Sequence, residues 1–286
     1  MALITAYGRD DADPATLERL VGQSMDSEGV YAVVLKERGH VDRSRGEGRL
    51  LAGVLPEPDP DDPLARPGRF VIEVDAGGPL RVAVDLLYGT NTGLFPDARP
   101  LWRFVRERAD GRRVLNLFSY TSVFGVAAAL GGARSTTNVD LVPSALERGQ
   151  INYTLNGLAP DARSHTRSDV FEFLRRARKR GTRWDLVVCD PPPVPTAGRK
   201  KRNRKGFDPA KDMERLLGSA LAVVEPGGGL LALSATRGTS RFEEPLAVAL
   251  ASVDHEPPSE LSRASDFPGD RTDGLRAMWV PIRPLS

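Results

Sequence analysis

From about residue 100 onwards, short apolar runs alternate with stretches of helical character. The apolar runs, which are typical of buried strands, cover residues 114–118, 135–139, 184–189 and 230–234. Helices are expected over residues 122–130, 143–155, 169–180 and 209–224, and a glycine turn is expected at 227–229. This alternation is typical of a parallel sheet with helices on both faces. The sequence therefore predicts a doubly wound, Rossmann-like α/β domain over residues 99–286.

Residues 1–98 are patterned differently. A Pro/Asp-rich stretch at 56–63 opposes both helix and central strand, so it predicts a surface loop or linker. Before it we expect a short helix at 14–25 and a strand at 30–35. After it we expect strands at 70–74 and 80–87, joined by a hairpin turn at 75–78. A small, β-rich N-terminal α+β domain over residues 1–98 follows.

The composition restricts metal chemistry and location. The chain of 286 residues contains one cysteine and three histidines, so neither a disulfide framework nor a zinc or other metal site is expected. Lys and Arg number 40 against 38 Asp and Glu, and this near balance says little about partners. The N-terminus lacks the order of a signal peptide, and no apolar run reaches the roughly 18–20 residues that span a bilayer. A soluble, cytoplasmic protein without a membrane partner is expected.

The first candidate site is the segment 116–121, which leads from a strand into a helix. In a doubly wound sheet, ligands bind at the carboxyl ends of the strands. The backbone N–H groups and hydroxyls of this segment could receive a carboxylate or phosphate. It lacks both the Gly-x-Gly-x-x-Gly pattern and Gly-Lys-Ser/Thr, which removes the best support for NAD or ATP. Ser119 and Thr121 could equally be ordinary helix caps.

Two acids follow the next strand ends. Asp140 lies about two dozen residues after the first segment, near the spacing at which an acid accepts hydrogen bonds from a ribose diol. It could instead simply start a helix. Asp169, followed by Glu172, forms a capping pair at a helix start and could also touch an adenine amine.

The strongest signal is Asp190-Pro191-Pro192-Pro193, directly after the strand at 184–189. Each proline removes an N–H and bars the preceding residue from helical angles, so the segment is stiff and rich in acceptor carbonyls. A rigid carboxylate and free carbonyls suit ring or amino N–H groups, and they suit the sulfonium of S-adenosylmethionine. The alternative is a strand end that the prolines merely stop.

Two basic runs flank this strand, over residues 175–183 and 199–205. The simplest interpretation of the first run, which lies on a predicted helix, is a face that contacts only solvent. The second leaves the Asp190 turn and borders the same cleft, so phosphate-backbone contact is its natural use. The candidate RNA-binding residues there are Arg199, Lys200, Lys201 and Arg202.

Six segments, 89–99, 114–121, 131–140, 152–157, 169–171 and 185–192, occur in an order and spacing typical of one family. From about residue 70 to its end, the chain resembles the class I S-adenosylmethionine-dependent methyltransferases of large-subunit ribosomal RNA, the RlmI/RlmK-like group. The first 68 residues do not match the RNA-binding module that longer members carry.

The resemblance implies S-adenosyl-L-methionine as cofactor and assigns roles to the strand-end residues. Asn116, Phe118, Ser119 and Tyr120 would lie along its methionyl part. Asp140 would take the ribose, Asp169 and Val170 the adenine, and Arg99 with Asp97 would close the pocket. The implied catalytic residues are Asp190, Pro191 and Pro192. The full cofactor-binding set is Arg99, Asn116, Phe118, Ser119, Tyr120, Thr121, Asp140, Leu141, Asp169, Val170 and Asp190.

The acceptor atom depends on whether a thiolate is available. Methylation at pyrimidine C5 needs a thiolate that adds to the ring. Ala235 stands at or near the position where the family's cytosine branch has its cysteine. Cys189, the single thiol, points away from the face used by Asp190, because successive strand side chains alternate. The guanine-N7 branch is the better resemblance. Arg237 could contact a guanine edge or the cofactor carboxylate, or have no role.

Three functions compete. The first is methylation of a base nitrogen of ribosomal RNA, similar to methylation at guanine N7. The alternative is a methyltransferase of the same fold that acts on a small molecule or peptide. A third is a cofactor-binding RNA chaperone or regulator without turnover, which has no need of the Asp190 turn. The expected partners are ribosomal RNA or a small-molecule substrate, and a homodimer stays open.

Overall fold

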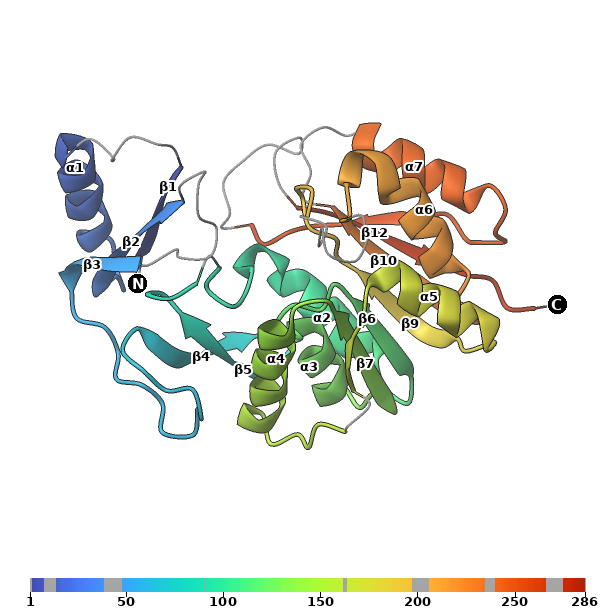
Figure 1. Ribbon diagram of the computed structural model, residues 1–286, viewed down its shortest axis with the longest axis horizontal. Helices are drawn as coiled ribbons and strands as arrows, with labels where there is room; N and C mark the ends of the chain where they lie inside the picture. Colours follow the sequence, from blue (N-terminus) through green and yellow to red (C-terminus); the bar gives the residue numbers. More distant parts are fainter. Residues whose placement is uncertain are drawn as a thin grey trace. The chain divides into compact units, whose positions relative to one another are not determined.

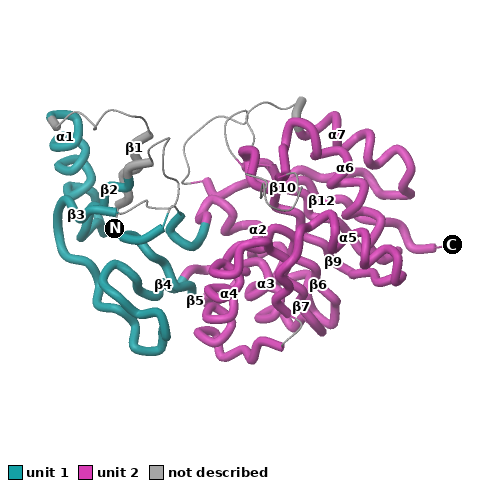
Figure 2. The backbone as a smooth tube through the Cα atoms, viewed as in Figure 1, with its two compact units in different colours: residues 1–73, 81–94 teal, residues 74–80, 95–286 magenta. Residues whose placement is uncertain are grey.

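The computed structural model describes residues 2–7, 14–38, 48–89, 91–161, 164–196, 206–234, 240–265 and 275–285 (Figure 1). The chain divides into two compact units, residues 1–73 with 81–94, and residues 74–80 with 95–286 (Figure 2). The expected domain boundary after residue 98 stays a prediction.

The first unit contains a three-stranded sheet and one helix. Its elements are β1 (Ala2–Tyr7), α1 (Pro14–Met25), β2 (Ala32–Arg38) and β3 (Gly48–Gly53). The central strand β2 pairs parallel with β1 and antiparallel with β3. Residues 32–35 of β2 are buried, in keeping with a central strand. The predicted helix at 14–25 is confirmed, whereas the strand expected at 30–35 begins at Ala32, and β1 was not expected.

The expected hairpin is formed by β4 (Arg69–Asp75) and β5 (Pro79–Asp85). In its turn, Asp75 Oδ1 accepts hydrogen bonds from the N–H groups of Gly77 and Gly78, both at 2.9 Å. The side chain thus satisfies the turn's backbone, which confirms the turn at 75–78.

The second unit is built on a seven-stranded sheet with the order β11-β12-β10-β9-β6-β7-β8. Strands β8, β7, β6, β9 and β10 are parallel, and β12 is antiparallel to β10. The elements in chain order are a 3₁₀ turn (Pro96–Ala98), α2 (Arg99–Arg108), β6 (Arg113–Leu117), α3 (Val123–Leu130), β7 (Ser135–Asp140), α4 (Pro143–Leu155), β8 (His165–Arg167), α5 (Val170–Lys179), β9 (Trp184–Cys189), α6 (Pro209–Leu221), β10 (Val224–Ser234), α7 (Ser240–Leu250), β11 (Ser259–Leu261) and β12 (Arg276–Pro281).

Helices cover both faces of this sheet (Figure 1). Leu115 and Leu117 of β6 and Val187 of β9 belong to a buried cluster with side chains of α5, α6 and α7. The alternate residues Val114 and Leu186 are also buried but lie outside that cluster, so they face the opposite side, where α2, α3 and α4 pack. This is the Rossmann-like α/β fold that the sequence predicts.

Two details of the prediction are wrong around β10. The helix expected to end at residue 224 ends at Leu221, and the glycines at 227–229 lie inside β10 rather than in a separate turn. The strand pairing with β9 shifts register between Val224 and Gly229. A Cβ on Gly229 would lie 2.1 Å from the Trp279 ring, so the glycines allow close packing within an irregular strand. Within the described part of the chain, no helix is long and apolar enough to cross a bilayer.

Candidate active site

The strand order places three chain segments at one edge of the sheet. The chain runs from β6 outwards through β7 to β8, then returns to the other side of β6 with β9. Leu117, the last residue of β6, is paired with both Val139 of β7 and Cys189 of β9. The residues that follow these strands therefore meet at the topological switch point, where such sheets bind ligands.

The segment after β6 has an unusual backbone. Phe118, Tyr120 and Ser122 have positive φ angles of 56°, 47° and 61°, although none of them is glycine. Such a conformation costs free energy and persists only where the surroundings hold it. Here the N–H of Ser119 donates to the carbonyl of Val139 at 3.0 Å, and the N–H of Ser122 donates to the carbonyl of Ser119 at 2.7 Å.

Asp140 supports the same segment from the end of β7. Its Oδ2 accepts a hydrogen bond from the N–H of Tyr120 at 2.9 Å, and its Oδ1 accepts one from the N–H of Val142 at 2.8 Å. Burial raises the pKa of this carboxyl group, while the backbone hydrogen bonds oppose that shift. The carboxylate therefore shapes the loop and the start of α4. The ribose role stays a prediction.

A chain of buried polar side chains lies behind the loop. Asn116 Nδ2 donates to Asn138 Oδ1 at 3.0 Å, and Asn138 Nδ2 donates to Tyr153 Oη at 3.0 Å. Tyr153 Oη in turn donates to Thr136 Oγ1 at 2.6 Å. The absence of a side chain at Gly125 makes room for this network, since a Cβ there would lie 2.2 Å from Asn138 Oδ1. Sequence reasoning missed Asn138 and Tyr153, and a glycine within a helix is the signal that could have indicated them.

Three buried side-chain oxygens of the segment 116–122 lack a partner within the described structure, and one of them, Ser122 Oγ, lies at the start of α3. Asn116 Oδ1 and Ser119 Oγ have no hydrogen-bond partner among the residues that the structure describes. Buried polar groups are normally paired, because an unpaired one costs about 1–3 kcal/mol. These two atoms fit the polar methionyl end of S-adenosylmethionine, which would supply the missing partners.

The helix-cap interpretation of Ser119 and Thr121 is wrong. The N-cap residue of α3 is Ser122, and its side chain makes no capping hydrogen bond. Thr121 is buried, and its carbonyl accepts a hydrogen bond from Asn152 Nδ2 at 2.9 Å. Both predicted residues therefore belong to the loop rather than to the helix start.

Asp169 and Val170 stand where β8 gives way to α5. Asp169 is the N-cap residue of α5, and its Oδ1 accepts a hydrogen bond from the N–H of Glu172 at 3.1 Å. The expected cap is thus confirmed. Val170 is buried, whereas Leu141, which follows Asp140, exposes 46% of its surface. Contact of these residues with an adenine ring stays a prediction.

Asp190, Pro191 and Pro192 continue directly from β9. The Asp190 N–H donates to the carbonyl of Leu117 at 3.4 Å, which ties the turn to the end of β6. Burial raises the pKa of the Asp190 carboxyl group to about 7, with a smaller contribution from the negative charge of Asp97. Pro191 is buried and Pro192 half-buried. A carboxyl group with a pKa near neutrality at a ligand-binding edge is typical of functional sites.

Aromatic rings border the loop. Phe118 packs on Phe207 with ring centroids 5.3 Å apart, and Tyr120 packs on Phe95 at 5.7 Å. Sequence reasoning also missed Phe207, which lies just before α6. Arg99 is the first residue of α2.

The candidate RNA-binding residues Arg199, Lys200, Lys201, Arg202 and Arg237 lie outside the described residues, as does Ala235. The described part of the chain holds no cluster of acids, histidines and cysteine that could bind a metal ion.

Comparison with known proteins identifies the family of this chain. The profile of the family described as S-adenosylmethionine-dependent methyltransferase matches residues 70–253. Ribosomal RNA large subunit methyltransferase I of Aeromonas hydrophila is 35% identical over 237 residues, which make up 81% of this chain and 56% of that protein. Ribosomal RNA large subunit methyltransferase K/L of Dichelobacter nodosus is 40% identical over 169 residues, 59% of this chain and 22% of the relative. The chain thus spans about half, or less, of the length of these curated relatives.

Among solved structures, SMU.776 in complex with SAH has a TM-score of 0.76 and 25% identity, over 98% of this chain and 69% of that one. These similarities agree with the RlmI/RlmK-like resemblance and with S-adenosyl-L-methionine as the cofactor. The chain belongs to the S-adenosylmethionine-dependent methyltransferase family.

Proposed function

We propose that this protein transfers a methyl group from S-adenosyl-L-methionine to a base nitrogen of ribosomal RNA, with guanine N7 as the candidate atom. The proposal depends on one observation, the meeting of the β6 loop, Asp140 and Asp190 at the switch point of a sheet from this family. The two curated relatives above are ribosomal RNA large subunit methyltransferases by name, which supports RNA as the substrate class.

The cofactor, when bound, supplies an activated methyl carbon on a sulfonium, which a nitrogen lone pair can attack directly. Asn116 Oδ1 and Ser119 Oγ would hold its methionyl end, since both atoms are buried and unpaired within the described structure. Asp140 would accept from the ribose hydroxyls while it holds the N–H of Tyr120. Hydrogen bonds within the protein hold the positive φ angles of this loop, and a loop fixed in this way lowers the entropic cost of binding.

Asp190 and the prolines after it would orient the acceptor base. A carboxylate that is charged above about pH 7 accepts hydrogen bonds from the N–H edge of a purine. The rigid Pro191–Pro192 backbone fixes the neighbouring carbonyls. Guanine N7 carries no proton, so the reaction needs positioning and exclusion of water rather than a general base.

The position of Cys189 favours nitrogen over carbon as the acceptor. It is the single cysteine of this chain, it is fully buried, and it packs within the cluster of α5, α6 and α7. Burial raises the pKa of its thiol, so a thiolate is disfavoured there. Cys189 therefore cannot supply the thiolate that adds to a pyrimidine ring in methylation at carbon.

The test is transfer of a labelled methyl group to deproteinised ribosomal RNA, followed by digestion to nucleosides. We expect label in 7-methylguanosine, and we expect Asp190→Ala to lower turnover much more than cofactor affinity. Label in a methylated pyrimidine carbon would contradict the nitrogen assignment. A parallel reaction contains a small-molecule extract in place of RNA. Label only in that extract would favour the alternative substrate class, and cofactor binding without transfer in either reaction would favour a non-catalytic role.

A further inference from the structure

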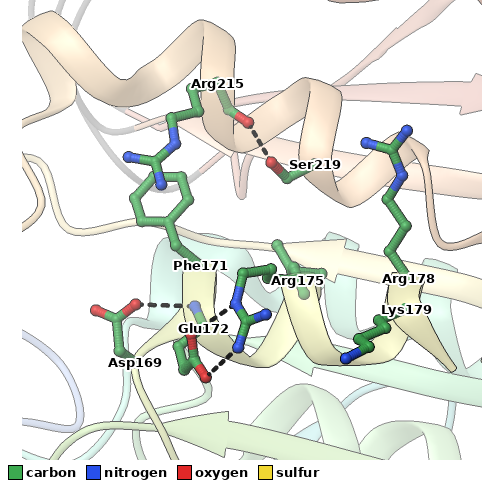
Figure 3. Close-up of a pocket in the computed structure, with 9 residues that line it drawn as sticks. Asp169, Phe171, Glu172, Arg175, Arg178, Lys179, Arg215 and Ser219 are labelled. Atoms are coloured by element: carbon green, nitrogen blue, oxygen red, sulfur yellow. Dashed lines mark hydrogen bonds and ion pairs between the residues drawn. The ribbon is translucent and has the colours of Figure 1, made fainter.

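A groove of about 610 Å³ lies between α5 and α6 on their solvent side (Figure 3). Its lining begins at Asp169, the N-cap of α5, and extends to Lys179, the last residue of that helix. Helix α6 contributes Arg215 and Ser219. The groove therefore starts near the candidate active-site edge and leads away from it along the outside of the domain.

The lining of this α5–α6 groove has four cationic side chains and two acidic ones among its nine residues. Arg178 and Lys179 lie three and four residues after Arg175, so each is its neighbour on the surface of α5, and all three are exposed and line the groove. Arg175 is already neutralised, because its Nε and Nη2 donate to the Glu172 carboxylate at 2.9 and 2.8 Å. Arg178 and Lys179 make no ion pair with any residue that the structure describes. Two positive charges thus remain available on the α5 side.

Arg215 provides a third charge from the opposite wall. Its guanidinium lies over the Phe171 ring, 4.1 Å from the ring centroid, as Figure 3 shows. Stacking uses the face of the guanidinium and leaves its N–H donors in the plane free for an anion. The Ser219 hydroxyl donates to the Arg215 carbonyl at 2.7 Å, within the same wall. The groove thus has one arginine, Arg215, positioned by a ring on the α6 wall, and two cations without an ion pair to any described residue, Arg178 and Lys179, on the α5 wall. This arrangement suits an anionic ligand better than a helix face that only contacts water.

We propose that the α5–α6 groove binds the phosphate backbone of the RNA substrate, an inference that rests on the proposed function. From residue 171 to residue 179 the helix rises about 12 Å, which matches about three nucleotide steps of a nucleic-acid strand. Arginine pairs with phosphate oxygens through two N–H groups, and lysine adds a point charge. Because the groove begins at Asp169, an RNA strand whose target base reaches the switch point can continue into it.

The test compares two variants that each lose three positive charges. The groove variant carries Arg178→Gln, Lys179→Gln and Arg215→Gln. The control variant carries Arg108→Gln, Arg112→Gln and Arg134→Gln. Arg112 and Arg134 immediately precede β6 and β7, at the amino edge of the sheet, and Arg108 ends α2. Both variants therefore have the same net charge, and they differ in where the charge is lost.

The readout is the affinity for deproteinised bulk ribosomal RNA as a function of salt. Three phosphate contacts contribute a slope of about 2 in log K against log salt, at about 0.7 per contact for a single strand. The groove variant should therefore bind about 100-fold more weakly at 0.1 M salt, with the difference vanishing towards 1 M. Titration with S-adenosylhomocysteine checks that each variant keeps its fold and cofactor site.

The outcomes separate the inference from the function on which it rests. If only the groove variant loses RNA affinity and salt dependence, the result supports RNA binding by the groove. Equal RNA affinity of the groove variant and the unmodified protein, with methyl transfer retained, overturns the groove and leaves the function intact. No RNA binding by the unmodified protein overturns both. A parallel titration with polyglutamate covers an acidic polypeptide as the occupant. If the unmodified protein bound polyglutamate and the groove variant lost that binding but kept its RNA affinity, the proposal would be overturned.

Discussion

Asp140→Ala removes a side chain that accepts two backbone hydrogen bonds at the candidate active site. The bond to Val142 is exposed, so water can replace it and its loss costs about 0.5–1 kcal/mol. The bond to Tyr120 is partly buried and restrains a residue with φ of 47°, so its loss costs about 1–3 kcal/mol. We expect the free energy of unfolding of the cofactor-free protein to fall by about 1.5–4 kcal/mol in total.

The same substitution should also weaken cofactor binding, by about 1–3 kcal/mol or roughly 5- to 150-fold, because it removes a ribose acceptor and loosens the loop. Urea unfolding measures the first effect, and calorimetric titration with S-adenosylhomocysteine measures the second. Asp75→Ala is the matched control, since Asp75 also accepts two backbone N–H groups but in an exposed hairpin turn. It should leave cofactor affinity unchanged. A variant at position 140 with the urea midpoint and the affinity of the unmodified protein would refute the reasoning.

Four further predictions concern Asp190, Gly125 and Cys189. Activity that needs a charged Asp190 should fall about tenfold per pH unit below about 7 in kcat/KM, and Asp97→Asn should move the midpoint to lower pH because it removes a negative charge. An unchanged midpoint would contradict that coupling. The pH dependence of stability linked to Asp190 has the opposite sign. The pKa of Asp190 is raised from 3.8 in the folded protein, so stability is lost as the pH rises from about 4 through 7. Asp190→Asn should abolish this loss, as measured by urea unfolding at several pH values. Gly125→Ala should destabilise the protein by about 1–3 kcal/mol by displacing the asparagine network, whereas Gly218→Ala, with open space around it, should stabilise it by about 0.5–1 kcal/mol; equal thermal shifts would argue against the clash. Cys189→Ser should retain methyl transfer, and complete loss in a folded variant would revive covalent catalysis.

The sequence predicts best those elements that have chemical end signals. Helix α4 runs from Pro143 to Leu155 as expected, since proline suits a first helical turn and Asn156-Gly157 stops the helix. The strand Trp184–Cys189 is an uninterrupted apolar run with prolines just beyond it. Helix α7 was not predicted, because Pro245 lies inside it, and β8 is too short for any periodic signal.

The sequence names candidate residues for the site, but it does not predict the contacts between them. The positive φ angles at Phe118 and Tyr120 have no signal in a segment without glycine. The bond from the Tyr120 N–H to Asp140 joins two strand ends, so it follows from the strand order and not from local pattern. The α5–α6 groove needs Arg215, some forty residues from Arg175, and only the packing of two helices brings them together.

The most direct test of the account is calorimetric titration of S-adenosyl-L-methionine into the pure protein, repeated with Asp140→Ala. We predict saturable binding to one site per chain, with an affinity that falls at least fivefold in the variant. A titration without heat of binding at several temperatures, for a protein that is folded by circular dichroism, would contradict the claim that the switch point of this sheet holds the methyl donor.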